Sequence, residues 1–142
     1  MTGNLGVIAM TESMDSAALT VFALKLEELG YESLWLPELF GREPVATAAY
    51  LLAQTTQLKV ATGIVNVYVR DACAMAQTRQ TLAELSAGRF ILGLGVSNPG
   101  LNETRGHVWQ MPLPKMKSYL AAMTEAVIDS ASTEKPAPLY IA

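Results

Sequence analysis

The sequence predicts an α/β protein with one parallel β-sheet, and three observations support this fold class. Five short apolar segments lack polar alternation, which is typical of strands buried on both faces. Four segments between them repeat apolar residues at intervals of three and four, as helices do when one face packs on a core. Strand and helix alternate without a linker or charge block, which favours right-handed crossovers within one domain, residues 1–142.

The strands are recognised by their Leu, Val, Ile and aromatic residues. In chain order they are predicted at Leu5–Met10, Tyr31–Pro37, Leu58–Val65, Arg89–Val96 and Pro138–Ala142. Two architectures use this alternation of strand and helix: the open doubly wound sheet and the closed eight-stranded barrel. The order of elements alone leaves both open.

The helices are recognised by their end signals. Asp15 or Ser16 can cap the first helix, which Gly30 ends, and Pro44 opens the second, which runs to about Thr55. Asp71 caps the third helix, which Gly88 ends, and the fourth strand follows it. A long loop, Ser97–Pro112, then leads to a fourth helix that starts near Pro114. The expected buried faces are Ala18, Phe22, Leu26 and Leu29 in the first helix, Met75, Thr78, Leu82 and Leu85 in the third, and Met116, Leu120, Met123 and Val127 in the fourth.

Composition disfavours several classes of protein. The net charge is −3 and the ten Lys and Arg residues form no run, so nucleic acid is not an expected partner. No uninterrupted apolar segment reaches the roughly 18 residues of a membrane span. The start of the chain does not resemble a signal peptide, and Cys73 is the single cysteine, so we expect a cytoplasmic protein without an internal disulfide.

The glycine pair Gly93 and Gly95 resembles the start of a dinucleotide-binding fingerprint. That fingerprint requires a third glycine and a helix directly after the strand. Asn98 occupies the third glycine position, Pro99 follows, and the next predicted helix starts far away. We therefore interpret the two glycines as positions where backbone or ligand approaches a strand closely.

Two residues that often carry chemistry occur once each. His107, in the long loop, is more typical of a surface or packing residue than of a catalytic base. Cys73 lies near a helix start without a visible base, which favours a small buried side chain. Metal-ligand spacing and a G-x-S-x-G nucleophile elbow are both absent from the sequence.

Sites in parallel α/β folds form at the carboxyl ends of the strands. The polar residues predicted there are Thr11, Glu12, Glu38, Asn66, Ser97 and Asn98. Ligand binding is one interpretation of these residues. Turn formation and helix capping, which Ser, Asn and Glu perform routinely, is the other, and the residues alone favour neither.

Three blocks resemble consecutive segments of luciferase-like monooxygenases: KLEELGYESLWLPE (25–38), LKVATGIVNVYVRD (58–71) and LAELSAGRFILGLGVSN (82–98). The second block, and RGHVWQMPLPKMKSYLAAM (105–123), are more similar to the deazaflavin-dependent branch of that family. The resemblance implies the N-terminal half of a (β/α)₈ TIM barrel, with about four βα units and a fifth strand. It also implies hydride transfer between coenzyme F-420 and a small organic substrate.

The same resemblance implies a cofactor site at the carboxyl face of the barrel. The peptide bond Gly63–Ile64 matches a cis bond that backs the middle ring of the cofactor, with Val65 and Asn66 beside it. Glu38 matches an acidic position near the pyrimidine ring, and Asn102 a contact from the loop after the fourth strand. Leu39 stands where members often carry a histidine, so the catalytic residue remains unassigned.

The resemblance also covers only part of a barrel, and the phosphate-binding loops of the family lie in the other half. Two alternatives therefore stay open: an FMN-dependent monooxygenase, and a truncated half-barrel without cofactor or catalysis. A half-barrel exposes two strand edges and an apolar face, and exposed edges pair with other chains. Together with the 51% apolar content, this predicts self-association, for example as a homodimer.

Overall fold

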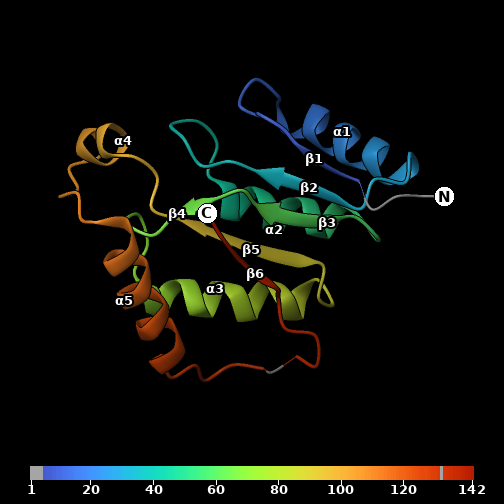
Figure 1. The fold of residues 1–142 in the computed structure, drawn as a ribbon. Helices are drawn as coiled ribbons and strands as arrows, with labels where there is room; N and C mark the ends of the chain where they lie inside the picture. The colour runs from blue at the N-terminus through green and yellow to red at the C-terminus, as the bar shows by residue number, and fades with distance from the viewer. Residues whose placement is uncertain (1–4, 132) are drawn as a thin grey trace.

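The computed structural model describes residues 5–131 and 133–142, and it contains the predicted alternation of strands and helices (Figure 1). The strands are β1 (Gly6–Ile8), β2 (Ser33–Leu36), β3 (Lys59–Thr62), β4 (Val65–Asn66), β5 (Phe90–Gly95) and β6 (Leu139–Ile141). The helices are α1 (Ser16–Glu28), α2 (Pro44–Gln54), α3 (Ala72–Leu85), α4 (Pro99–Thr104) and α5 (Pro112–Glu125).

The sheet follows the order of the chain. All of its pairings are parallel, and β1, β2, β3, β5 and β6 are neighbours in that sequence, while β4 adds a second short pairing to β5. An open doubly wound sheet would reverse its strand order at a switch point. The order here has no reversal, and α1, α2 and α3 wrap around one side of the sheet (Figure 1), as in successive units of a barrel.

Local signals set the helix ends as predicted. The Asp15 and Asp71 carboxylates accept hydrogen bonds from the amides of Ala18 and Ala74, both at 2.8 Å. Pro44 opens α2, and Gly30 follows the last turn of α1 with a φ of 78°. These contacts lie within three residues along the chain, which explains why the sequence alone predicts them.

Three predicted segments differ from the structure. The third strand is not continuous from Leu58 to Val65, because a cis peptide bond at Gly63–Ile64 separates β3 from β4. The loop after β5 contains α4, which begins at Pro99, so the expectation that no helix closely follows Gly95 was wrong. The fingerprint still lacks its third glycine. The next helix, α5, begins at Pro112 rather than Pro114.

The buried helix faces agree with the prediction in part, since Leu26, Met75, Leu82, Met116 and Met123 are buried as expected. In α1 the core residues are Leu19, Ala23 and Leu26, whereas Ala18 and Leu29 are exposed. In α3 Ala76 and Ala83 are buried beside Met75 and Leu82, whereas Leu85 is exposed; Val127 follows the end of α5 and is exposed. Small alanines let a helix approach the sheet closely, and a pattern of large apolar residues overlooks them.

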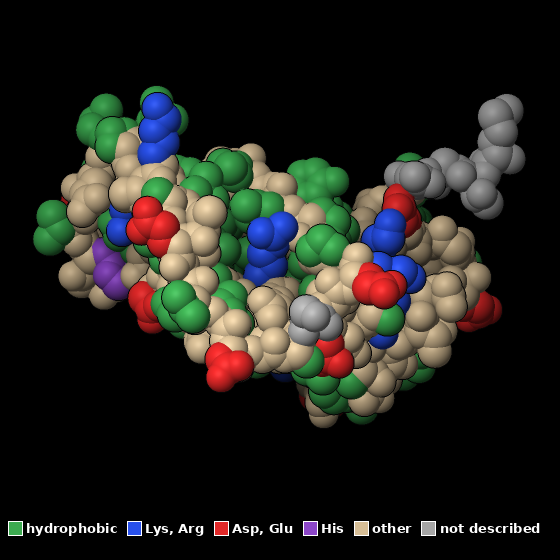
Figure 2. All heavy atoms as spheres, turned by 90° about the horizontal axis from the view of Figure 1, so that it is seen from below, with side chains coloured by type: hydrophobic (Ala, Val, Ile, Leu, Met, Phe, Trp, Pro, Cys, Tyr) green, Lys and Arg blue, Asp and Glu red, His purple; other side chains and the backbone are tan. Residues whose placement is uncertain are grey.

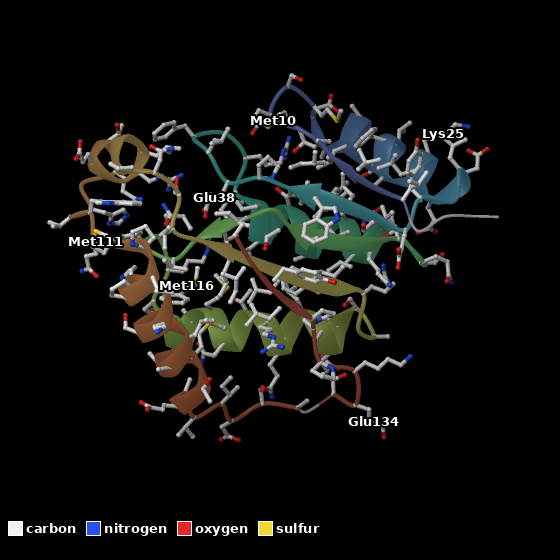
Figure 3. The ribbon with its side chains drawn as sticks, in the orientation of Figure 1. Met10, Lys25, Glu38, Met111, Met116 and Glu134 are labelled. Atoms are coloured by element: carbon white, nitrogen blue, oxygen red, sulfur yellow. The ribbon has the colours of Figure 1, made fainter. Side chains whose placement is uncertain are left out.

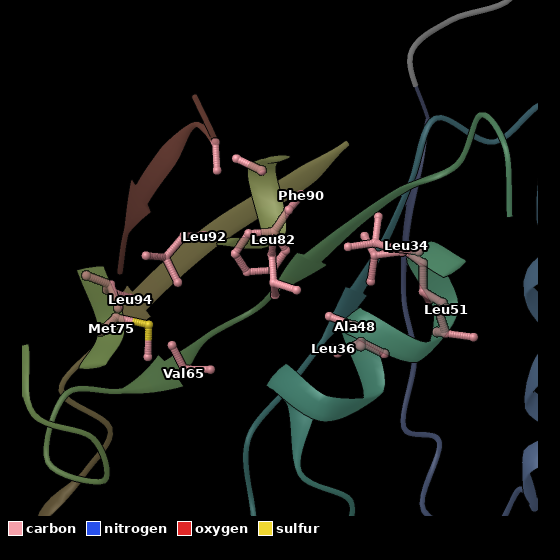
Figure 4. Packing of buried hydrophobic residues seen from close by; sticks show 14 of the residues in the cluster. Leu34, Leu36, Ala48, Leu51, Val65, Met75, Leu82, Phe90, Leu92 and Leu94 are labelled. Atoms are coloured by element: carbon pink, nitrogen blue, oxygen red, sulfur yellow. The ribbon is translucent and has the colours of Figure 1, made fainter. Parts of the chain in front are cut away.

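The core lies between the sheet and the helices. All six residues of β5 are buried, and Phe90, Leu92 and Leu94 pack with residues of the helices and the other strands (Figure 4). Within the described part of the chain, none of the helices combines the length and the hydropathy that crossing a bilayer requires. On the face shown in Figure 2, basic side chains alternate with acidic ones instead of forming a patch.

Residues 86–90, SAGRF in the third block, make hydrogen bonds that link neighbouring elements at the amino ends of the strands. The Arg89 guanidinium donates to the carbonyls of Leu52 (2.7 Å) and Leu58 (3.1 Å) and to the Thr55 hydroxyl (3.1 Å). The Ser86 hydroxyl donates to the Leu82 carbonyl at 2.6 Å and accepts from the amides of Arg89 and Phe90. The block that carries the resemblance most specifically therefore has a structural role, as expected at the amino face of a barrel.

Glu27 makes a second set of linking hydrogen bonds at the amino face. Its carboxylate accepts hydrogen bonds from the amides of Thr56, Gln57 and Leu58 and from the Thr56 hydroxyl, at 2.7–3.2 Å. Partial burial by itself would raise the pKa of this carboxyl. The hydrogen bonds from Leu58, Gln57 and Thr56 outweigh it and lower the pKa from 4.5 to about 2.

We predict that Glu27→Gln lowers the free energy of unfolding at pH 7 by about 2 kcal/mol, because a neutral amide accepts these bonds less well. A lowered folded-state pKa stabilises above the unfolded pKa and loses this effect as pH falls through the folded value. The difference between the two proteins should therefore be full above about pH 5 and shrink towards pH 2. Urea unfolding at several pH values measures it; a difference independent of pH would contradict the assignment.

The two edge strands expose apolar side chains. Leu5, Ile8 and Met10, in and around β1, are 56–68% exposed, and Tyr140 and Ile141 in β6 are 54% and 56% exposed. We propose that the chain self-associates through these edges, because unpaired strand edges recruit further strands. In sedimentation equilibrium, the expected result is a mass at least twice the 15.3 kDa of the monomer. A compact monomer at all concentrations would reject the proposal.

Candidate functional site

The carboxyl ends of the parallel strands meet at one edge of the sheet, on the side where α4 lies (Figure 1). Glu38 follows β2 at this edge (Figure 3). Asn66 ends β4, and Asn102 lies in α4 just after β5. The three polar residues that the resemblance singled out therefore come from three successive strand ends.

A bulge between β3 and β4 shapes this edge. It contains the cis bond Gly63–Ile64, the same bond that the resemblance implies. Facing it, Gly93 and Gly95 leave room that a side chain would fill: a Cβ on Gly93 would lie 2.1 Å from the Thr62 carbonyl oxygen, and one on Gly95 would lie 2.6 Å from Ile64. This confirms the interpretation that the two glycines permit close approach. Ile64 is half-buried above them.

Hydrogen bonds join Glu38, Asn66 and Asn102 into one network. The Asn66 amide donates to the Glu38 carboxylate at 2.7 Å, and the Asn66 side chain donates to Asn102 Oδ1 at 2.8 Å. The Asn102 side chain donates in turn to the carbonyls of Val96 (2.9 Å) and Asn98 (3.0 Å). The network ties the β3–β4 bulge to the strand ends on both sides.

The network is buried. The Glu38 side chain is 4% exposed, and Asn66 and Asn102 are 3% and 0% exposed. Val65 is fully buried in the core, so only its backbone is available at this edge, whereas Gly63 and Ile64 are partly exposed. Buried polar groups need hydrogen-bond partners, and Glu38, Asn66 and Asn102 have them within this network. The contacts of the six residues with a cofactor remain predictions.

Arg70 completes the network, and sequence reasoning missed it. Its guanidinium pairs with the Glu38 carboxylate at 2.9 Å and also contacts Glu43. The Tyr119 hydroxyl donates to the Arg70 carbonyl at 2.9 Å; burial, and then the charge of Asp71, raise the pKa of Tyr119 to about 12. A basic residue directly before the Asp71 cap, at a strand end, was the available signal.

The remaining strand-end candidates form turns and caps. The Asn98 side chain accepts from the Leu101 amide and caps α4, and Ser97 adopts a positive φ of 60°. Thr11 is buried, and its carbonyl accepts from the Met14 amide in a turn. The Glu12 side chain lies against Gly41, where a Cβ would be 1.9 Å from its Cγ. The capping interpretation is confirmed for Asn98.

The single histidine and the single cysteine lie away from this network. His107 packs with its ring centroid 5.9 Å from that of Tyr68, which fits the packing role expected for it. Cys73 is exposed, so the expectation of a buried side chain was wrong; it lies on the outer side of the first turn of α3. Among residues 5–131 and 133–142, no three His, Cys, Asp or Glu side chains gather as a metal site would require.

Two cavities in the described part of the molecule are large enough to hold a small ligand. The larger, about 510 Å³, lies between α3, α5 and the segment before β6, and is lined largely by apolar side chains such as Leu120 and Met123. The smaller, about 380 Å³, adjoins the carboxyl edge and is lined by Glu38, Phe40, Arg42, Arg70 and Arg105 among others. Convergent polar groups at the strand ends favour the smaller cavity as a ligand site, and of the six predicted site residues only Glu38 lines it.

Comparisons with known proteins identify the family of the chain. The family profile described as luciferase-like monooxygenase matches residues 3–136. The 5,10-methylenetetrahydromethanopterin reductase of Methanolobus tindarius is 32% identical over 103 residues, which are 72% of this chain and 32% of the relative. The F-420-dependent glucose-6-phosphate dehydrogenase of Kineococcus radiotolerans is 31% identical over 133 residues, 87% of this chain and 38% of the relative.

A solved structure gives the same picture of the fold. The oxygenating constituent of 3,6-diketocamphane monooxygenase from Pseudomonas putida, in complex with FMN, superposes with a TM-score of 0.80 at 15% identity. The match covers 99% of this chain and 51% of that one. The chain thus spans about a third of the length of the two relatives above and about half of this structure.

Proposed function

The chain belongs to the luciferase-like monooxygenase family, and we propose that it forms part of an oxidoreductase that transfers hydride between coenzyme F-420 and a small organic substrate. The F-420-dependent relative from Kineococcus radiotolerans supports the choice of cofactor. The chain matches only part of that relative, so the activity is proposed for the whole protein to which these βα units belong.

The observation that carries the proposal is the braced bulge at the carboxyl edge. Glu38, Asn66 and Asn102 hold the turn at Gly63–Ile64 from beneath through buried hydrogen bonds. The side chain of Ile64 packs over Gly93 and Gly95 and stays partly exposed, so it has a fixed position at the strand ends. Sites on rigid elements orient a ligand more accurately than sites on free loops.

The residues present fit a flat ring of the flavin type. Ile64 offers an apolar wall for one face of the ring, and small-molecule sites are lined predominantly by apolar side chains of this kind. The polar atoms of Glu38, Asn66 and Asn102 are largely paired with protein groups, so in this proposal these residues mainly position the wall. When bound, the deazaflavin supplies the hydride chemistry, and the protein supplies orientation and exclusion of water.

The residue that moves a proton is not assigned. Leu39, at the position where the family often has a histidine, is 39% exposed and carries no titratable group. Its neighbour Glu38 is engaged with Arg70 and with the Asn66 amide. Neither residue is therefore assigned as the acid or base of the reaction.

Fluorescence titration of the chain with coenzyme F-420 and with FMN tests the proposal. We predict saturable binding of F-420 that weakens at least about tenfold in Ile64→Glu, because a carboxylate on the wall would have to be desolvated beneath the ring. Val21→Glu, at an exposed position of α1, is the matched control and should bind normally. Circular dichroism verifies that both variants are folded.

Each alternative has its own outcome in this titration. Preferred binding of FMN would favour a flavin-dependent monooxygenase. This outcome is included because one structure with a similar fold is an FMN complex. Binding of neither cofactor would favour a half-barrel without catalysis. Either result would overturn the proposal for coenzyme F-420.

A further inference from the structure

The cavity beside Glu38 has a composition that the cofactor site does not use. Its volume is about 380 Å³, enough for a small polar group and part of its carrier. Three arginines, Arg42, Arg70 and Arg105, line it together with two glutamates, Glu38 and Glu43. The walls thus carry one more guanidinium group than carboxylates.

Both carboxylates in the cavity wall form ion pairs with the same arginine. Arg70 pairs with both Glu38 and Glu43. Within the described residues, Arg42 and Arg105 form no salt bridge; Arg42 donates to the Met14 carbonyl and Arg105 to the Leu39 carbonyl. Arg42 and Arg105 are therefore outside the ion pairs, and the cavity wall carries one positive charge more than its two carboxylates balance.

Each of these two arginines also has one N–H group without a hydrogen-bond acceptor. Arg42 Nε and Arg105 Nε are buried, and neither has a hydrogen-bond partner. A buried donor without an acceptor is unfavourable, and each instance in a folded protein calls for an explanation. An oxyanion would supply it, because a guanidinium that turns towards a carboxylate or phosphate group binds through Nε and a terminal nitrogen together.

The rim of the cavity is apolar. The Arg105 guanidinium lies over the Phe40 ring, 5.4 Å from its centroid, and Phe40 is 64% exposed. Leu39 is also exposed next to it. A ligand that places an oxyanion between the arginines would therefore have apolar surface within reach of its remaining atoms.

We propose that Arg42 and Arg105 bind the carboxylate or phosphate group of an anionic organic substrate, with Phe40 contacting its apolar part. This inference rests on the proposed function, since it names the substrate class for the same carboxyl edge. The oxyanion could belong to the substrate or to the cofactor, and the chemistry at the arginines is the same. The lining favours the substrate, because Ile64, the proposed wall for the cofactor ring, is not among the residues that line the cavity.

Titrations of the chain with phenyl phosphate, benzoate and neutral benzamide, followed by nuclear magnetic resonance, test the site. We predict saturable shifts of the Arg42 and Arg105 side-chain Nε–H signals with at least one of the two anions and none with benzamide. Arg42→Gln and Arg105→Gln should each weaken anion binding at least about tenfold. Arg79→Gln, which removes a guanidinium bound to the Ala137 carbonyl in the larger cavity, is the matched control.

A parallel titration of these variants with coenzyme F-420 separates this inference from the proposed function. Unchanged F-420 affinity together with lost anion binding supports a substrate site. Anion binding in a chain that fails to bind F-420 would sink the proposed function and leave the anion site standing. Loss of F-420 affinity in Arg42→Gln or Arg105→Gln would assign the arginines to the cofactor and overturn the inference, as would equal binding of anions by all variants.

Discussion

Gly93→Ala is expected to lower the free energy of unfolding by about 3 kcal/mol or more, a large part of the stability of a domain of this size. The new Cβ would lie 2.1 Å from the carbonyl oxygen of Thr62, which belongs to the backbone of the neighbouring strand. A flexible side chain could move aside, but here β3 and β5 would have to separate. The Thr62 hydroxyl, which bonds both the amide and the carbonyl of Gly93 at 2.9 Å, would lose its place as well.

Chemical denaturation of the purified variant measures this effect. Gly100→Ala is the matched control, because a Cβ there meets only the Asn98 side chain, at 3.6 Å, and its unfolding free energy should change by less than about 0.5 kcal/mol. If Gly93→Ala were as stable as Gly100→Ala, the close contact between β3 and β5 would not exist in solution.

Glu38→Ala is expected to cost about 3–5 kcal/mol of unfolding free energy, the range for removing one partner of a buried ion pair. The side chains of Glu38 and Arg70 are 4% and 16% exposed, so water replaces the lost carboxylate only in part. The Asn66 amide would lose its acceptor at the same time. The bulge at Ile64 should loosen, and affinity for the cofactor should fall with it.

The comparison with a surface pair makes this test specific. Glu32→Ala removes the ion-pair partner of Lys59. The side chains of Glu32 and Lys59 are 34% and 43% exposed, so this change should cost less than about 1 kcal/mol of unfolding free energy. Glu38→Gln keeps an acceptor for the Asn66 amide and should fall between the two. Equal costs for Glu38→Ala and Glu32→Ala would show that the network at the carboxyl edge is not buried in solution.

The sequence predicted well those features that depend on near neighbours in the chain. The caps at Asp15 and Asp71, the start of α2 at Pro44 and the glycine after α1 are local, and all four agree with the structure. The resemblance supplied the break at Gly63–Ile64, which the apolar run from Leu58 to Val65 conceals. The helix faces were wrong where alanines, such as Ala76, form the contact with the sheet.

The candidate site was predicted only in part. Glu38 and Asn66 were visible as polar residues at strand ends, and Asn102 through the resemblance. Arg42, Arg70 and Arg105 carried no signal as a group, because they belong to three separate βα units and lie next to no shared motif.

What the sequence by itself determined is the alternation of parallel strands and covering helices, because hydrophobic period and end signals act over one or two turns of chain. What only the tertiary structure decided is the pairing of polar groups at the carboxyl edge. The Glu38–Asn66, Asn66–Asn102 and Leu39–Arg105 hydrogen bonds span 28, 36 and 66 residues. Such pairings depend on the register and curvature of the sheet, and hence on the burial of the whole core rather than on any local pattern.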